Sequence, residues 1–501
     1  MALYGGITLP DRPDPENIRR LDLMPLPMIS DMMRYGIRIN PGYLDEVSSQ
    51  LKERMGDLRC EITNEIPEGV LEKVLGETDD NEETDRDEGT EAGTNPGPII
   101  NYQMEVESTN QIVRLLYDHL GLHRGGVEVK KTKGGGHLST GKKTLEQLKR
   151  EHPVVPLILE YRECAKLNGT YAESMPRRAK LHPKGPDCPL CGRHHYTDEY
   201  RIHTQIMTTR TVTGRTASKN PNLANIPTRT KLGQAIRRAF IASEGHVIVQ
   251  RDWAQIELRL LAHRSGDPTM IQVYWNDGDI HVRTAMGTFD ISDPEKVDKI
   301  LHRAPAKNVN FAVCYGITGA GLLDLMAVTY STAGLPLPEW MTETWCEEFI
   351  GKWFGFYPAV KRYLDDEESR IRRYGIAWTS AGRVRRVPEV RSCHAYIQEA
   401  GVRQGCNHGV QGDNADTMKL AMGEVQDRLD VLRDEYGIPA YPLMTIYDEL
   451  LVECAEDDGE TIDALLEEVM DNVRVDKDTG ELLCKVPIKS DGKLLKEWKK
   501  E

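Results

Sequence analysis

The chain has 501 residues, which is long enough to bury a large core and to form two or more domains. No run approaches the eighteen consecutive apolar residues of a membrane-spanning helix, and the N-terminus lacks the apolar segment of a secretion signal. The net charge of −15 argues at first sight against nucleic acid as a partner, and the ten scattered cysteines predict a reducing, cytoplasmic compartment.

The acidic charge is concentrated in one segment. Residues 77–91 contain nine acidic residues and one arginine, and so account for eight of the fifteen net negative charges. The segment also has almost no apolar residues, which is typical of a disordered, solvated loop. We predict such a loop over 77–98. The rest of the chain is only mildly acidic and has basic clusters, for example at 129–149 and 201–215. Nucleic acid is therefore not excluded.

The predicted elements alternate between helical and strand-rich regions. Apolar residues spaced three to four positions apart predict helices, at 20–75, 109–122, 145–167, 268–375 and 391–435. Short strands are predicted over 200–252, a hairpin over 376–390, and further strands on both sides of Asp448. This order predicts an α+β protein in which a helical insertion separates two halves of one sheet.

The segment 188–195, CPLCGRHH, has the composition of a zinc knuckle. Its four candidate zinc ligands are Cys188, Cys191, His194 and His195. Four ligands within eight residues are cramped, and structural zinc usually takes its second pair from a distant segment, so His203 or Cys164 could replace one of them. The alternative is a solvent-exposed turn with reduced thiols.

Two carboxylates interrupt apolar strands about two hundred residues apart. Asp252 ends the apolar run that starts at Val247, and Asp448 interrupts the run at 442–454. If the strands are neighbours in one sheet, the carboxylates converge, and such a pair favours hard cations such as magnesium. Two magnesium ions ~3.5–4 Å apart stabilise both the attacking and the leaving oxygen of a phosphoryl transfer. A single aspartate at a strand end is more often a turn or a helix cap.

A third segment, 302–316, predicts a helix with Pro305 in its first turn, where proline is tolerated. Cationic and aromatic residues recur on it every four positions, as Arg303, Lys307, Phe311 and Tyr315. Residues four apart share one helix face. Two cations spaced for a triphosphate, followed by two rings spaced for a base and a sugar, indicate a nucleotide-binding stripe.

Several segments of the chain together resemble a known family. DWAQIELR (252–259), RAPAKNVNFAVCYG (303–316) and YDE (447–449) resemble the three polymerase motifs of family A DNA polymerases, the family of bacterial DNA polymerase I and many phage replicases. TGRTASKNPNLANIP (213–227) and RQGCNHGVQGDNAD (403–416) are similar to further segments of that family. The resemblance runs from about residue 22 to the end of the chain. It implies a right-hand architecture with a thumb, a palm built on an antiparallel sheet, and helical fingers.

The resemblance also implies domain boundaries. They are a lead at 1–22, a thumb at 23–210, the first part of the palm at 211–265, the fingers at 266–390 and the second part of the palm at 391–501. The acidic loop and the cysteine knuckle would both belong to the thumb.

The roles of individual residues follow from the same resemblance. Asp252 and Asp448 would hold two magnesium ions with help from the carbonyl of Trp253, and Lys307 would donate a proton to the pyrophosphate leaving group. The nucleotide pocket would be formed by Arg303, Lys307, Phe311, Tyr315, Gln255, Glu257 and His281, with Glu257 crowding the 2′ position of the sugar. Contacts to the primer–template would come from Arg215, Asn225, Arg403, Asn407, Gln411, Tyr447 and Glu449.

Five residues depart from the family pattern. Trp253 stands where tyrosine is usual, Ala254 where serine is common and Ala312 where glycine is common. Ala224 replaces a glutamine that would contact DNA, and Tyr447 replaces the histidine that normally precedes the last Asp-Glu pair. None of them removes a metal ligand, but the last two put minor-groove and primer-end contacts in doubt.

The implied function is template-directed DNA synthesis from deoxynucleoside triphosphates, in phage or bacterial replication. Only about twenty residues precede the thumb, so we expect no proofreading 3′–5′ exonuclease domain in this chain. A separate exonuclease, a helicase or a single-strand binding protein are the partners consistent with that expectation.

Two other classes of function stay open. A two-metal nuclease would also use paired carboxylates and magnesium, although it has no need of the stripe on 302–316. A zinc-bearing module that binds nucleic acid without catalysis would keep its binding after loss of Asp448.

Overall fold

The computed structural model of the chain describes residues 3–4, 7–8, 14–76, 104–124, 138–149, 151–227, 230–480 and 482–499. The acidic loop predicted at 77–98 lies outside the described residues, as does most of the lead before Asp14. The chain divides into two compact units. The first consists of Met1–Arg38, Lys180–Asn225 and Ile241–Trp498, and the second of Ile39–Ala179, Ile226–Phe240 and Lys499–Glu501.

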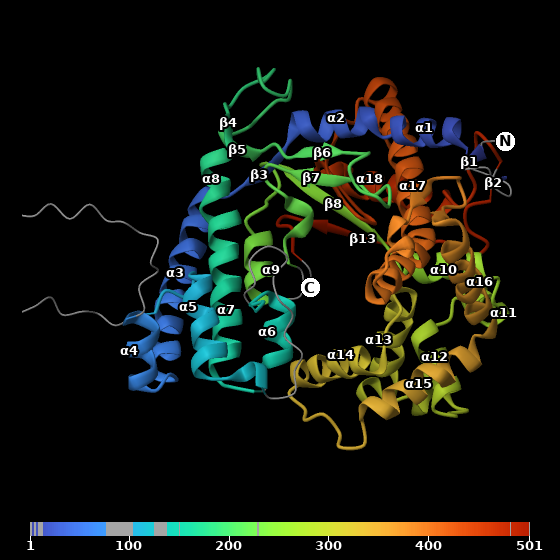
Figure 1. Ribbon diagram of the computed structural model, residues 1–501. Coiled ribbons are helices and arrows are strands. Elements are labelled where there is room, and N and C mark those ends of the chain that lie inside the picture. The colour runs from blue at the N-terminus through green and yellow to red at the C-terminus, as the bar shows by residue number, and fades with distance from the viewer. Residues whose placement is uncertain are drawn as a thin grey trace, which may run out of the picture. The chain divides into compact units, whose positions relative to one another are not determined.

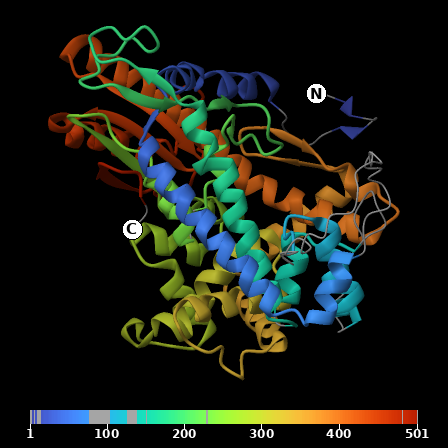
Figure 2. The ribbon, with the colours of Figure 1, turned by 90° about the vertical axis from the view of Figure 1, so that its left-hand side faces the viewer.

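The second unit is helical. Its two longest helices, α3 (Pro41–Asn64) and α7 (Val154–Leu167), lie side by side (Figure 1, Figure 2). The side chain of Asn40 caps α3 by accepting a hydrogen bond from the backbone N–H of Tyr43 at 3.1 Å. Shorter helices complete the unit: α4 (Glu68–Gly76), α5 (Thr109–Val113), α6 (Lys142–Leu148), α8 (Ser174–Arg178) and α9 (Lys231–Arg237).

Two predicted helices are interrupted. The helix predicted at 145–167 is divided between α6 and α7, because Pro153 disfavours the helical conformation of the residue before it and then serves as the N-cap of α7. The helical region predicted at 20–75 contains the strand β3 (Ile37–Ile39), in which alternate residues are buried.

A four-stranded antiparallel sheet lies at the centre of the first unit (Figure 1). Its order is β11 (Ala440–Ile446), β12 (Glu449–Ala455), β8 (His246–Trp253) and β13 (Ser490–Leu495). The helix α18 (Gly459–Asn472) packs against β8 and β13. Residues of β8 and β12, such as Val249 and Leu450, are fully buried in the core beside residues of the neighbouring helices. The strands that carry Asp252 and the residues after Asp448 are therefore direct neighbours.

A long helical insertion separates the two halves of this sheet, as predicted. It contains α10 (Ile256–Ser265), α11 (Pro268–Trp275), α12 (Ile280–Thr288), α13 (Ala304–Ala312), α14 (Gly319–Thr332), α15 (Glu343–Phe356) and α16 (Pro358–Tyr374). The predicted hairpin follows as β9 (Ile376–Trp378) and β10 (Val384–Arg386), and then the 42-residue helix α17 (Ala395–Tyr436). The predicted α+β fold class is confirmed.

The remaining elements of the first unit precede β8. They are the helices α1 (Pro15–Leu23) and α2 (Leu26–Tyr35) and the strands β1 (Leu3–Tyr4), β2 (Ile7–Thr8), β4 (Lys180–His182), β5 (Glu199–Ile202), β6 (Gln205–Met207) and β7 (Ala217–Lys219). Strands β3, β5 and β4 form a second small sheet. None of the described helices combines the length and the apolar character that crossing a membrane requires.

Candidate active site

The two predicted metal-binding carboxylates lie at the same end of the central sheet. In the antiparallel pairing of β12 with β8, Glu449 is directly opposite Asp252. One residue beyond this pair, the backbone N–H of Trp253 donates a hydrogen bond of 3.1 Å to the carbonyl oxygen of Asp448. Asp252 and Asp448 are both half-buried. Neighbouring strands thus bring together two aspartates that are 196 positions apart in the sequence.

The backbone adopts a left-handed conformation close to each of the two aspartates, at Tyr447 and at Gln255. Tyr447, in the two-residue turn between β11 and β12, has φ 58°, which is the conformation that tight hairpin turns require. Gln255, between β8 and α10, has φ 57°. Non-glycine residues in this region are uncommon and gather at functional sites, where the surrounding structure holds them in place.

The donor set fits a hard divalent cation. Two carboxylates and a backbone carbonyl supply only oxygen ligands, which magnesium prefers. The indole of Trp253 is anchored by a hydrogen bond from Nε1 to the carbonyl of Met470 at 3.0 Å, which fixes the residue predicted to offer its own carbonyl. A third acid, Asp491 on β13, is directly opposite Asp252 on the other side of β8. Asp491 is not recognisable from the sequence, because only the strand register reveals its position.

The predicted nucleotide-binding helix is continuous but changes type at both ends. Arg303 ends a π-helical turn (Lys299–Arg303), the α-helix α13 carries Lys307 and Phe311, and Tyr315 ends a 3₁₀ turn (Val313–Tyr315). Lys307, Phe311 and Tyr315 are all exposed. An exposed cation and two exposed aromatic rings that follow one another at intervals of four residues are consistent with a ligand-facing surface.

Arg303 and His281 are held by residues that the sequence analysis did not assign. Arg303 donates to Asp279 Oδ2 from Nη2 at 2.7 Å and from Nε at 3.0 Å, and Asp279 also caps α12. His281 accepts a hydrogen bond at Nδ1 from the Asn310 amide at 2.9 Å, and its ring lies 5.3 Å from that of Phe311. Burial lowers the pKa of His281 to about 4, so the imidazole is neutral at physiological pH.

Acidification is expected to destabilise the protein through His281. The unfolded chain binds the proton with a pKa of ~6.5, so this contribution to stability is present above that pH and is lost as the pH falls toward 4. Between pH 7.5 and pH 5 the loss amounts to about 2 kcal/mol of unfolding free energy. Urea unfolding of the wild type and of His281→Gln at both pH values measures it. Equal acid losses in the two proteins would contradict the assignment.

Glu257 is the centre of a series of polar contacts, called the polar chain below, that joins Tyr315, Gln411, Arg215, Tyr447 and Asn225. Its Oε1 pairs with Arg215 Nη2 at 2.6 Å, and its Oε2 accepts a hydrogen bond of 2.9 Å from the hydroxyl of Tyr315. Gln411 Nε2 donates to the same hydroxyl at 3.0 Å. Burial, together with the Glu257 carboxylate, raises the pKa of Tyr315 to about 12, so its phenol keeps the proton that it donates. Arg215 and Tyr315, which come from two other segments that resemble the family, therefore meet at the carboxylate of Glu257.

The polar chain continues to the turn that carries Asp448. The guanidinium of Arg215 lies 5.0 Å from the ring centre of Tyr447, and the hydroxyl of Tyr447 donates to Asn225 Oδ1 at 3.1 Å. Six of the residues predicted to bind nucleotide or DNA are thus linked to the carboxylate end of the sheet.

The other predicted DNA contacts differ in exposure. Arg403 is exposed on α17, and its side chain lies so close to Gly316 that a Cβ there would come within 2.9 Å of Arg403 Cδ. Asn407 is half-buried one turn further along α17. Glu449 is buried, and its Oε1 accepts a hydrogen bond from the indole of Trp498 at 3.0 Å. Its carboxylate is therefore engaged inside the protein, unlike the exposed side chains predicted with it.

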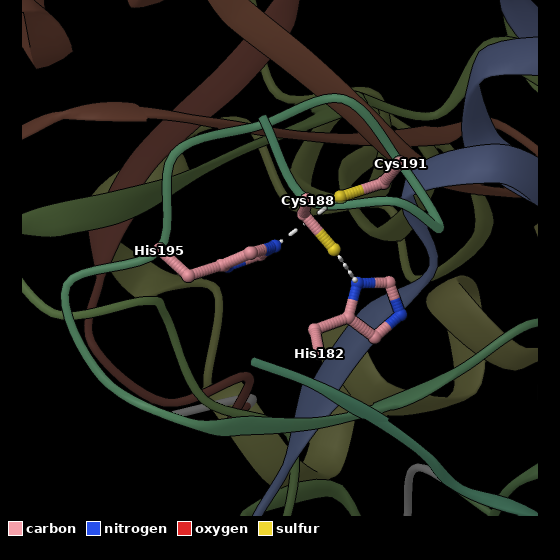
Figure 3. Close-up of side chains that lie close together, drawn as sticks. All are labelled: His182, Cys188, Cys191 and His195. Carbon is pink, nitrogen blue, oxygen red and sulfur yellow. Dashed lines mark hydrogen bonds between the residues drawn. The ribbon is translucent and has the colours of Figure 1, made fainter. Parts of the chain in front are cut away.

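The predicted zinc ligands are only partly brought together. Cys188, Cys191 and His195 lie close to one another and are joined by His182 of β4, which the sequence analysis did not consider (Figure 3). The inclusion of His194 was wrong, because this side chain is exposed and stacks against Tyr196, with ring centres 4.7 Å apart. The spacing of Cys188 and Cys191 is visible in the sequence. The fourth residue, His182, joins them only through the pairing of β4 with β5.

A sheet that presents paired carboxylates beside a helix with exposed cationic and aromatic residues is the arrangement predicted for a polymerase palm and fingers. Comparison with known proteins identifies the class. The family model for DNA polymerase family A matches residues 86–500. The chain therefore belongs to DNA polymerase family A.

Similar proteins include several bacterial polymerases. The thermostable DNA polymerase I of Thermus thermophilus is 40% identical over 375 residues, which are 75% of this chain and 40% of that protein. DNA polymerase I of Chloroflexus aurantiacus is 32% identical over 454 residues, which are 91% of this chain and 41% of that protein. The chain thus spans about 40% of the length of these relatives.

A solved structure agrees with the fold. The polymerase domain of Pol1 from M. smegmatis, in complex with DNA primer–template and dNTP, has a TM-score of 0.70 and 26% sequence identity. The match covers 96% of this chain and 70% of that chain. It confirms the predicted polymerase fold class.

Proposed function

We propose that this chain is a DNA-directed DNA polymerase that adds deoxynucleoside triphosphates to the 3′ end of a primer. The observation that carries the proposal is the pairing of β8 with β12, which sets Asp252 and Asp448 at one end of a sheet. The polar chain from Tyr447 through Arg215 and Glu257 to Tyr315 ties the nucleotide-facing helix to the same end. The similar solved domain holds a primer–template and a dNTP.

The cofactor of this proposed activity is magnesium, as two ions. Asp252 and Asp448 would hold them, with the carbonyl of Trp253 assisting. When bound, two such ions stabilise the charge on the attacking and leaving oxygens of the phosphoryl transfer. An acid in the position of Asp491 adds to the negative field at this end of the sheet.

The protein's own side chains would bind and orient the nucleotide. Arg303 and Lys307 would contact the triphosphate, since both are cationic and lie one helical turn apart. The two hydrogen bonds from Arg303 to Asp279 Oδ2 hold the guanidinium in one direction before substrate arrives. Lys307 would donate the proton that the pyrophosphate needs as it leaves. Phe311 would face the sugar, and Tyr315 the templating position.

The primer–template would run along the residues of the polar chain and α17. Arg215, Arg403 and Gln411 would contact it largely in the minor groove, where the hydrogen-bond acceptors are similar for every base pair. Such contacts suit an enzyme that must accept any sequence. The proposed setting is bacterial or phage DNA replication, with a separate exonuclease, helicase or single-strand binding protein as partners.

The proposed domain boundaries are those of the sequence analysis. They give a thumb at 23–210, a palm at 211–265 and 391–501, and fingers at 266–390. The two compact units follow a different division, because 180–225 groups with the first unit and 39–179 with the second.

Glu257 is proposed to exclude ribonucleotides by its bulk. Glu257→Ala should admit ribonucleoside triphosphates more readily, by about one to two powers of ten if the lost discrimination is ~1.4–3 kcal/mol. Glu257→Gln is the control, because it keeps the size of the side chain while removing the ion pair with Arg215. Incorporation of matched ribo- and deoxynucleotides by the three proteins gives the ratio. Relaxed selectivity in Glu257→Gln as well would assign the effect to charge instead of bulk.

Primer extension tests the function itself. A labelled primer annealed to a longer template is incubated with the protein, the four deoxynucleoside triphosphates, and either magnesium or a chelator. We expect lengthening of the primer in magnesium alone. Shortening of the primer, with or without nucleotides, would favour the nuclease alternative.

A further inference from the structure

Four potential metal ligands converge in the first unit, away from the carboxylate pair in the sequence. The ligand atoms of His182, Cys188, Cys191 and His195 all lie within 4.8 Å of one another, and the four residues are 0–3% exposed (Figure 3). Cys191 Sγ lies 3.2 Å from His195 Nε2, and Cys188 Sγ lies 3.4 Å from His182 Nδ1. Two thiols and two imidazoles form a ligand set that structural zinc sites commonly use.

The backbone around these residues is tied down independently of any metal. The N–H of Gly192 donates to the carbonyl of Cys188 at 2.7 Å, which makes the tight turn of the knuckle. Gly185 and His195 exchange two backbone hydrogen bonds of 2.9 Å each. His182 is brought in by the pairing of β4 with β5, where it is opposite Glu199. The site is thus pre-organised from two short strands and one turn.

The outward contacts of His182 and His195 leave the inward nitrogen of each ring available to bind a metal. His203 Nδ1 faces the carbonyl of Met33 at 2.9 Å and so carries a proton, which makes its Nε2 an acceptor. That Nε2 lies 3.0 Å from His182 Nε2, so His182 is protonated there and has its lone pair on Nδ1. His182 Nδ1 is the nitrogen that faces Cys188.

The second imidazole is arranged in the same way. His195 Nδ1 lies 3.1 Å from the carboxylate oxygen Oε2 of Glu199, which leaves the lone pair on Nε2 facing Cys191. A carboxylate behind a ligating histidine is a common outer partner in zinc sites, because it fixes the tautomer and the ring orientation.

We propose that this cluster binds one zinc ion through His182 Nδ1, Cys188 Sγ, Cys191 Sγ and His195 Nε2. A tetrahedral ion with bonds of ~2.0–2.3 Å needs ligand atoms about 3.3–3.8 Å apart. The pairs Cys188–His182 and Cys191–His195 are already near that separation. Binding replaces the two thiol protons, which are released to solvent. All four positions are filled by protein, so the ion has a structural role.

The proposed zinc site is connected to the sheet of the active site by buried charges. Glu199, behind His195, pairs with Arg201 at 2.7 Å, and Arg201 reaches Glu453 of β12 at 3.2 Å. Arg193, inside the knuckle, pairs with the same Glu453 oxygen at 2.6 Å. These four residues are at most 2% exposed. The ion therefore stabilises the contact between the knuckle and the strand that follows Asp448.

Zinc content tests the proposal. Wild-type protein purified without chelator and passed through gel filtration should contain about one zinc per chain by elemental analysis, and Cys188→Ser and His182→Ala should lose most of it. His194→Ala is the matched control and should keep its zinc, because that imidazole is exposed a few residues away. Removal of zinc from the wild type by a chelator should lower its melting temperature by several degrees.

A second measurement needs no variant and so does not depend on the variants folding. Cobalt exchanged into the wild type should give the visible absorption of a tetrahedral ion with thiolate ligands. A wild-type protein that holds no zinc and gives no such absorption with cobalt would overturn the proposal. Retention of zinc by His182→Ala with loss in His194→Ala would overturn the ligand set. Primer extension by a zinc-free protein is a separate outcome, because the magnesium site shares none of these ligands.

Discussion

Asp252→Asn and Asp448→Asn are each expected to reduce nucleotide addition by about three powers of ten or more, because several kcal/mol of charge stabilisation is lost with a metal ligand. Asparagine keeps the size of the side chain, so strand pairing between β8 and β12 should survive. Primer–template binding should stay close to that of the wild type, since it rests on other residues. Single-turnover extension in magnesium and a gel-shift titration measure the two properties.

The control for this pair is Asp457→Asn. Asp457 is exposed just beyond the other end of β12, so the same chemical change there should leave extension unaltered. Near-normal extension by Asp252→Asn or Asp448→Asn would contradict the assignment of the site. Loss of extension in Asp457→Asn would show that the assay reports general damage.

Phe311→Tyr is expected to make the enzyme accept dideoxynucleotides about ten to a hundred times more readily. In the family that the sequence resembles, the 3′-hydroxyl of a nucleotide can hydrogen-bond to its own phosphate oxygens, and a dideoxynucleotide has no such group. A phenol donates from nearly the same place, whereas the phenyl ring of Phe311 cannot. A hydrogen bond to a charged oxygen is worth roughly 1.5–3 kcal/mol, which sets the expected range.

Chain termination at matched ratios of dideoxy- to deoxynucleotide measures this discrimination. Phe354→Tyr is the control, because it adds the same hydroxyl to a half-buried ring on α15. If Phe311→Tyr terminates chains no more often than the wild type, then Phe311 does not face the sugar. The orientation assigned to α13 would then be wrong.

The sheet and its carboxylates were predictable because their signals are local. An apolar strand that ends on an aspartate is visible at Asp252, and the turn at Tyr447 and Asp448 is visible between two apolar runs. Pairing of the two strands then follows from the need to bury both. The predicted insertion was also visible, because its apolar spacing changes from two to three or four residues.

Other parts of the site depend on contacts between distant residues and were not predictable in this way. No sequence pattern indicates that Asp491 is opposite Asp252, or that Asp279 orients Arg303. The cluster of two cysteines and two histidines shows the same limit. The CxxC spacing identified Cys188 and Cys191, but His182 joins them through the pairing of β4 with β5, and adjacency in sequence wrongly favoured His194.

Template-selected addition of a single nucleotide tests the central claim most directly. A primer–template with one defined templating base is mixed with each deoxynucleoside triphosphate in turn, with magnesium. The paired carboxylates and the helix bearing Lys307 and Phe311 predict that the primer grows by one residue with the complementary nucleotide, and far more slowly with the other three. Absence of extension with all four, or a primer that only becomes shorter, would contradict the assignment of a polymerase site to this chain.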